Sequence, residues 1–125
     1  QKAVSEQMTK VAHTSNLYHT NPSLELAEKL ISNSPGMSKV FFCNSGTEAA
    51  EAALKFSRVY QNAHGGAATR NRFIAMKKSF HGRSLGALSM TYKPAIREPF
   101  KPMLMPNVDH IDFNSIEQLE ATIGP

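Results

Sequence analysis

The sequence predicts an α/β fold with a mostly parallel sheet. Three short apolar runs, at 39–43, 72–78 and 107–113, have the composition of strands. Segments with helical periodicity lie between these runs and after the last one. Turn-forming residues separate most of the segments. Strands that alternate with helices along the chain are typical of α/β layers with parallel strands.

The first forty residues are expected to be mainly helical. Residues 3–11 are compatible with a short helix, and the polar segment 13–22 is rich in turn formers, with Leu17 and Tyr18 as apolar anchors. A second helix is expected to start at Asn21 as its cap, with a proline at the first helical position, and to end in the turn at 33–36. Its apolar face would comprise Leu24, Ala27, Leu30 and Ile31.

The segment "KVFFC", 39–43, reads as a buried strand because its apolar residues do not alternate with polar ones. A helix from about Thr47 to Gln61 should follow. Small and aromatic residues recur along it at spacings of four, three and four, which predicts a buried face that packs closely on a sheet. These residues are Ala49, Ala53, Phe56 and Tyr60.

After this helix, residues 62–71 read as a flexible loop and 72–78 as the second strand. The segment 79–90 should turn and become a short helix from about Ser84. An extended, irregular segment is expected next, because it contains four prolines. They are Pro94, Pro99, Pro102 and Pro106.

Residues 107–113 read as the third strand. The last helix should begin at Asn114, with Glu117 three residues later completing a capping box.

Composition indicates an ordinary globular protein of at most one domain: 125 residues, 41% of them hydrophobic. The net charge of +4 comes from scattered basic residues, which argues against a nucleic-acid interface. No apolar run reaches the roughly 18 residues of a membrane span, and no signal peptide opens the sequence. The chain starts at Gln1 and ends at Gly124-Pro125, so we expect a piece of a longer protein.

Cys43 is the only cysteine, so an internal disulfide is excluded and a reducing compartment is expected. The residue stands in an apolar run, where it should be a small buried hydrophobic side chain. No metal site is expected.

The join between the first strand and the next helix, Ser45-Gly46-Thr47-Glu48, has two interpretations. As a capping box it would serve only to start the helix. It also follows a strand, at the edge where open parallel sheets bind ligands, and exposed N–H groups at a helix start favour phosphate. Gly46 would let an anion reach the backbone, while the hydroxyls of Ser45 and Thr47 add donors.

A second candidate segment, "SFHGRSLGAL", follows the second strand and should share that sheet edge. Phe80 could be a core residue, and His81 a loop histidine with a structural hydrogen bond. We call Ser45, Gly46 and Thr47 the phosphate cradle. Together with Gly82 and this cradle, however, Phe80 and His81 would form a pocket suited to a flat phosphorylated cofactor, because an aromatic ring can lie over a planar ligand.

Both segments resemble the class III pyridoxal-phosphate-dependent aminotransferases, especially the acetylornithine branch. The resemblance is carried by "FFCNSGTEAAEAALKFSR" and "SFHGRSLGALSMT", and by "HTSNLY", "PSLELAEKL" and "REPFKPMLMP". It covers nearly the whole chain. It implies a three-layer αβα fold in which residues 1–125 form the N-terminal part of the large, cofactor-binding domain of a fold type I transferase.

The resemblance also implies roles. Ser45, Gly46 and Thr47 would hold the phosphate of pyridoxal phosphate. Phe80 would stack on the pyridine ring of the cofactor. Phe80, His81 and Gly82 would together form one wall of the cofactor pocket. Glu51 is more in keeping with a structural role than a catalytic one. The family usually has asparagine where Ala50 stands, which should change helix packing rather than chemistry.

Transamination requires a lysine that forms a Schiff base with the cofactor, and an acid against the pyridine nitrogen. In the family both lie well downstream of this region. Neither role is assigned to the local lysines and aspartates, so no catalytic residue is named and the 125 residues alone are expected to be inactive. The residues considered were Lys55, Lys77, Lys78, Asp109 and Asp112.

The implied reaction exchanges an amino group between N-acetylornithine and 2-oxoglutarate, in arginine biosynthesis. Ornithine aminotransferase, 4-aminobutyrate aminotransferase and glutamate-semialdehyde aminomutase are the alternatives within the class. A non-catalytic phosphate- or nucleotide-binding α/β module, or a degenerate partner subunit, is the alternative outside it. The family implies a homodimer, in the mitochondrial matrix of a eukaryote or otherwise in the cytoplasm.

Overall fold

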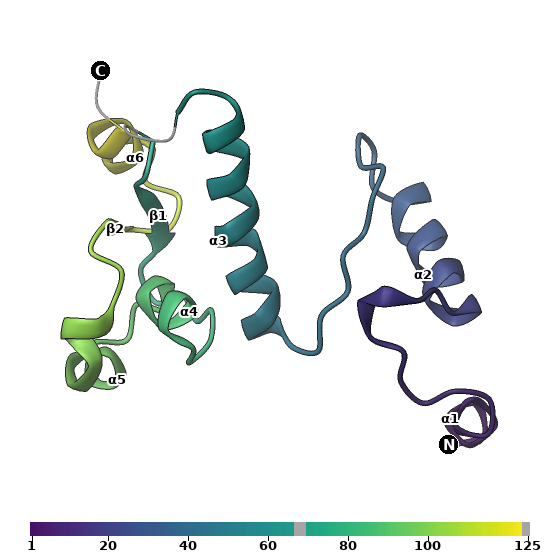
Figure 1. Cartoon of the computed structure of the whole chain (residues 1–125). Coiled ribbons are helices and arrows are strands. Elements are labelled where there is room, and N and C mark those ends of the chain that lie inside the picture. Colours follow the sequence, from purple (N-terminus) through teal and green to yellow (C-terminus); the bar gives the residue numbers. More distant parts are fainter. Residues whose placement is uncertain (67–69, 124–125) are drawn as a thin grey trace. The chain divides into compact units, whose positions relative to one another are not determined.

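The computed structural model describes residues 1–66 and 70–123 and divides into two compact units, Gln1–Phe42 and Cys43–Pro125 (Figure 1). All of the predicted site residues belong to the second unit. Among the described residues, no helix combines the length and apolar character that crossing a membrane requires.

The first unit contains helix α1 (Lys2–Met8), a 3₁₀ turn η1 (Ser15–Leu17) and helix α2 (Asn21–Ser32). The prediction that Asn21 caps α2 was wrong by one residue. Thr20 is the cap, and its side chain and that of Ser23 form a reciprocal capping box. Pro22 was predicted at the first helical position and is instead the second helical residue. It still lies in the first turn, where the N–H groups have no intrahelical acceptor and proline is tolerated.

The predicted strand at 39–43 is not formed in the described structure. The segment is neither helix nor strand, and the sheet of the described residues contains only β1 and β2, which pair with each other. A strand requires a partner ladder, and a one-dimensional apolar pattern cannot show whether one is present. Phe41 is 52% exposed, and Cys43 is half-buried rather than buried.

The second unit is built on two parallel strands, β1 (Phe73–Met76) and β2 (Val108–Ile111). Their register places Ala75 beside His110, and the Lys77 N–H continues the ladder to the carbonyl of Ile111 at 2.7 Å. This confirms the predicted parallel sheet for these two segments. Among the described residues, the buried hydrophobic side chains are Ala75, Ala87, Leu88 and Ile111.

Helix α3 (Gly46–Ala63) starts and ends close to the predicted positions. It ends where His64 is the cap and Gly65 adopts a left-handed φ of 75°, a conformation that glycine takes without strain. Residues 62–63 are therefore helical, against the loop predicted for 62–71. The central part of that loop prediction, 67–69, lies outside the described residues.

The predicted buried face of α3 was wrong. Phe56 and Tyr60 are 55% and 59% exposed. The face that includes Thr47 and Glu51 contacts helix α4 instead. Both faces carry apolar residues, so helical periodicity alone could not show which one is buried. The hydrogen bonds that Glu51 makes with α4 favour the face with Thr47 and Glu51.

Helix α4 (Leu85–Met90) begins directly after Ser84, as predicted, and lies between α3 and β2 (Figure 1). The proline-rich segment was predicted to be extended but forms helix α5 (Pro94–Arg97) and the 3₁₀ helix η2 (Glu98–Met103). Pro94 and Pro99 each lie in the first turn of one of these helices, where proline is tolerated.

The last helix, α6 (Ile116–Ile123), starts later than predicted. Asn114 has a left-handed φ of 60°, and Ser115 provides the capping oxygen to the N–H of Gln118 at 3.4 Å. Gln118, not Glu117, reaches back, and its side-chain oxygen accepts the Asp112 N–H at 2.8 Å. The capping residues therefore lie one position beyond the predicted pair.

Candidate functional site

The start of α3 is capped by Ser45, whose hydroxyl oxygen accepts the Glu48 N–H at 3.2 Å. The Glu48 carboxylate accepts the N–H of Asn44 at 2.7 Å. The capping interpretation of this turn is therefore correct, and these two bonds fix the direction in which the helix leaves the preceding segment. They do not involve the N–H groups of Gly46 and Thr47.

Gly46 is the first residue of α3, and the fold does not require a glycine there. A Cβ built on it would meet no atom within 4 Å, and its φ is not in the left-handed region. Among the described residues, no acceptor takes the N–H of Gly46 or Thr47. Two donors at a positive helix end and an unobstructed backbone are suited to an anion.

The segment carrying Phe80, His81 and Gly82 begins where β1 ends. Lys78 has a left-handed φ of 65°, which turns the chain away from the strand. Phe80 is 65% exposed, so its ring is available to a ligand. The Arg83 guanidinium carbon lies 6.0 Å from the centroid of that ring.

Ser79 fixes the imidazole of His81. The Ser79 hydroxyl donates to the carbonyl of Met76 at 2.5 Å and lies 3.1 Å from His81 Nε2. A hydroxyl has one proton to donate, so Nε2 must carry the proton of the second bond.

Gly82 brings the two predicted segments into contact. Its φ is 137°, and a Cβ at this position would lie 2.8 Å from Thr47 Cγ2 and 2.9 Å from Thr47 Cβ. The backbone after Phe80 therefore lies directly against the side chain of the third residue of the cradle. Only glycine permits this approach, for reasons of both space and conformation.

A second close approach lies one helical turn further along α3. A Cβ on Gly86 would lie 2.5 Å from Glu51 Oε2. Glu51 Oε1 accepts the hydroxyl of Ser84 at 2.5 Å and the N–H of Ala87 at 3.0 Å, so it caps α4 from another helix. Partial burial raises the pKa of Glu51, but its hydrogen bonds with Ser84, Ala87 and Gly86 lower the pKa by more. The net pKa is therefore below its ordinary value. Glu51 is ionised and structural.

Three of the lysines and aspartates considered for catalysis, Lys77, Asp109 and Asp112, form ion pairs. Lys77 Nζ lies 2.8 Å from Asp112, and Arg72 lies 2.8 Å from Asp109. The hydrogen bond with Asp112 raises the pKa of Lys77, so this amine is protonated and not nucleophilic near neutral pH. For Lys77, Asp109 and Asp112, this pairing favours a structural role.

Comparison with known proteins identifies the family of this chain. The family model "Aminotransferase class-III" matches residues 1–122. The chain belongs to the class III aminotransferase family. Members of this class use pyridoxal phosphate.

The class III relatives most similar in sequence include acetylornithine aminotransferases. That of Archaeoglobus fulgidus is 48% identical over 120 residues, which is 96% of this chain and 30% of the relative. The probable mitochondrial acetylornithine aminotransferase of Dictyostelium discoideum is 44% identical over 98% of this chain and 27% of the relative. The chain thus spans less than a third of the curated relatives it matches.

Solved structures of transaminases share the fold. The omega transaminase of Pseudomonas jessenii, solved in complex with PMP, has a TM-score of 0.80 and 35% identity over 90% of this chain and 25% of its own. The adenosylmethionine-8-amino-7-oxononanoate aminotransferase of Methanocaldococcus jannaschii has a TM-score of 0.81 and 30% identity over 92% and 27%. The fold is therefore that of the fold type I transaminases, as predicted.

Sequence reasoning missed two residues that support the site. Thr91 is fully buried and bonds to the backbone of His81 and Gly82. Gly86 lets α4 approach Glu51 on α3, the residue for which a structural role was predicted. Their partners are distant in sequence, so no local pattern could have revealed them.

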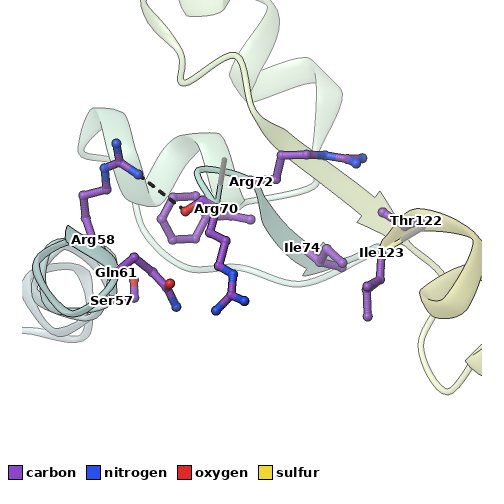
Figure 2. Close-up of a pocket in the computed structure, with 9 residues that line it drawn as sticks. Ser57, Arg58, Gln61, Arg70, Arg72, Ile74, Thr122 and Ile123 are labelled. Atoms are coloured by element: carbon purple, nitrogen blue, oxygen red, sulfur yellow. Dashed lines mark hydrogen bonds between the residues drawn. The ribbon is translucent and has the colours of Figure 1, made fainter. Parts of the chain in front are cut away.

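A hollow of about 420 Å³ lies at the start of β1, away from the candidate site (Figure 2). Three arginines border it, but Arg72 is paired with Asp109, and Arg58 Nη1 lies 3.4 Å from the carbonyl oxygen of Arg70. It adjoins the start of β1, whereas the Phe80 segment follows the end of that strand, so it is separate from the candidate site. Its lining comprises Ser57, Arg58, Gln61, Arg70, Arg72, Phe73, Ile74, Thr122 and Ile123.

Proposed function

We propose that this chain is the N-terminal part of the cofactor-binding domain of an acetylornithine-type aminotransferase. Ser45, Gly46 and Thr47 bind the phosphate of pyridoxal phosphate. Phe80, His81 and Gly82 form a wall against its pyridine ring. The contact between Gly82 and Thr47 carries this proposal, since it joins the anion-suited helix start to the segment with the exposed aromatic ring.

Each residue has a distinct part in holding the cofactor. The free N–H groups at the start of α3 and the hydroxyl of Thr47 donate to phosphate oxygens, and the absence of a side chain at Gly46 lets the phosphate approach. Phe80 presents its ring face to a planar group. When bound, pyridoxal phosphate supplies the electron sink that amino-group transfer needs. The chain's own contribution is binding and orientation.

The amino-group exchange belongs to the whole protein, and we propose N-acetylornithine and 2-oxoglutarate as its substrates. The names of the acetylornithine aminotransferases of Archaeoglobus fulgidus and Dictyostelium discoideum support this choice. The lysine that bonds to the cofactor and the acid against the ring nitrogen would come from sequence beyond these 125 residues. A homodimer is the expected assembly, and the mitochondrial relative supports a matrix location in a eukaryote.

The test uses the purified full-length protein. Pyridoxal phosphate is titrated into the apo form while its absorbance is followed, and amino donors are then supplied with 2-oxoglutarate. We expect a change in the bound-cofactor spectrum on adding N-acetylornithine, and a higher kcat/KM for it than for ornithine or 4-aminobutyrate. Preference for ornithine would contradict the substrate assignment alone, whereas failure to bind the cofactor would contradict the whole proposal.

A further inference from the structure

Thr91 lies outside the two site segments but is bonded to one of them. It follows the last residue of α4 and is 0% exposed. Its hydroxyl oxygen accepts the N–H of His81 at 2.8 Å and the N–H of Gly82 at 3.3 Å, and the hydroxyl donates to the carbonyl of Gly82 at 3.2 Å. One hydroxyl thus uses its donor and both acceptor positions on the same short loop.

Those three bonds anchor the His81–Gly82 part of the loop to Thr91. Thr91 is itself held, because its N–H donates to the carbonyl of Ala87 at 3.0 Å. Gly82 also contacts the Thr47 side chain. The loop is therefore held between Thr91 and the cradle, and a shift of the loop away from Thr91 would alter its contact with Thr47.

We propose that Thr91 is a positioning residue for the cofactor: it sets the height of the Phe80–Gly82 wall above the phosphate cradle. It does not touch the cofactor. Without its hydroxyl, two N–H groups and one carbonyl of the wall lose their partners inside the protein, and the loop will rearrange to satisfy them. The wall would then no longer match the ring, although the cradle remains. This inference rests on the proposed function.

Thr91→Val tests the proposal, because valine has nearly the same shape and lacks the hydroxyl. The matched control is Ser89→Ala. Ser89 is also 0% exposed and lies in α4, two residues before Thr91, and its hydroxyl oxygen accepts the backbone N–H of Met105 at 2.9 Å. The Ser89→Ala variant therefore loses a buried hydrogen bond as well, but one that supports the segment at Met105 and not the Phe80–Gly82 loop.

Three measurements on the full-length protein are compared across these variants. Hydrogen exchange of the His81 and Gly82 amides in the apo protein should accelerate in Thr91→Val and stay unchanged in Ser89→Ala. The circular dichroism of bound pyridoxal phosphate should change only in Thr91→Val. Its cofactor affinity should fall about tenfold, the order expected for a misplaced wall plus unpaired groups.

Thr91→Ser keeps the hydroxyl and removes only the methyl group, so it should restore the dichroism signal and the affinity. If Thr91→Val does not fold, an altered cofactor signal in the folded Thr91→Ser protein would overturn the proposal, and a wild-type signal would support it. Equal cofactor signals in Thr91→Val and Ser89→Ala, with the wild-type protein binding the cofactor, would reduce Thr91 to a stabilising residue. Failure of the wild-type protein to bind would instead contradict the proposed function.

Discussion

At the scale of single residues, the site contains two glycines with opposite reasons for being there. Gly82 is required by the fold, because its φ of 137° and its contact with Thr47 exclude a side chain. Gly46 is not, because a Cβ there meets nothing and its backbone is ordinary. A glycine that the fold can do without, at a helix start, is explained by a ligand that needs the space.

We predict that Gly46→Ala separates binding from stability. The helix should be unchanged or more stable by up to about 1 kcal/mol, since alanine is the better helix former. Pyridoxal phosphate should bind at least about tenfold more weakly, because the methyl group obstructs the phosphate. Thermal unfolding of the apo protein and a cofactor titration measure the two effects, and an unchanged affinity would show that the phosphate does not approach Gly46.

Gly82→Ala should instead impair both properties. The added methyl group must displace Thr47 and the backbone strains, so we expect a loss of about 1–3 kcal/mol in the free energy of unfolding together with weaker cofactor binding. Urea unfolding of the apo protein measures the loss. Gly36→Ala is the control for backbone strain alone, because Gly36 also has a left-handed φ, of 82°, but open space around its Cβ position. A Gly82→Ala loss no larger than the control's would contradict the close approach.

At the scale of elements, α3 and α4 are joined by Glu51, which caps α4 across the interface. Glu51→Gln should reduce the free energy of unfolding by about 0.5–2 kcal/mol, because a neutral amide oxygen is a weaker acceptor for the cap of α4 than the carboxylate. Glu120→Gln, an exposed position on α6, should have no measurable effect. Chemical denaturation measures both variants, and equal stability of the two would show that the cap contributes nothing.

The same carboxylate makes stability depend on pH in a predictable direction. The pKa of Glu51 is lower in the folded protein than its ordinary value of 4.5, through its hydrogen bonds with Ser84, Ala87 and Gly86, which outweigh the opposing effect of burial. A lowered folded pKa stabilises the protein above the unfolded pKa, and that contribution is lost as the pH falls through the folded pKa. The difference in stability between wild type and Glu51→Gln should therefore shrink below about pH 4.5. A difference that stays constant down to pH 3 would contradict this linkage.

The helices and strands also show which features of the fold can be predicted from local sequence patterns and which cannot. The parallel strands β1 and β2, the start of α4 and the cap at Ser45 follow local patterns and were predicted. The strand at 39–43 and the buried face of α3 depend on partners that a local pattern does not contain, and both predictions failed. The same reason explains the two candidate-site segments: each was found locally, but the Gly82 contact and the support from Thr91 were not.

At the scale of the whole molecule, the described residues expose many large hydrophobic side chains. Phe56 on α3 is 55% exposed and Phe113 beyond β2 is 83% exposed, while few hydrophobic residues are buried. The two-stranded sheet also presents unpaired edges. Together with the 27–30% share of its relatives that the chain spans, these features indicate surfaces that other parts of a longer protein would cover.

The isolated 125-residue chain should therefore self-associate and bind a hydrophobic dye. Light scattering measured against concentration, together with the fluorescence of that dye, checks this expectation. The full-length protein under the same conditions is the control and should show a fixed particle mass and little dye fluorescence. A monodisperse monomer of the isolated chain that unfolds cooperatively would contradict the expectation.

A crystal structure of the full-length protein with pyridoxal phosphate tests directly whether residues 45–47 and 80–82 bind the cofactor. We predict phosphate oxygens within hydrogen-bond distance of the backbone N–H groups of Gly46 and Thr47, and the ring face against Phe80. A phosphate bound elsewhere, with the start of α3 open to solvent, would contradict the assignment of both segments.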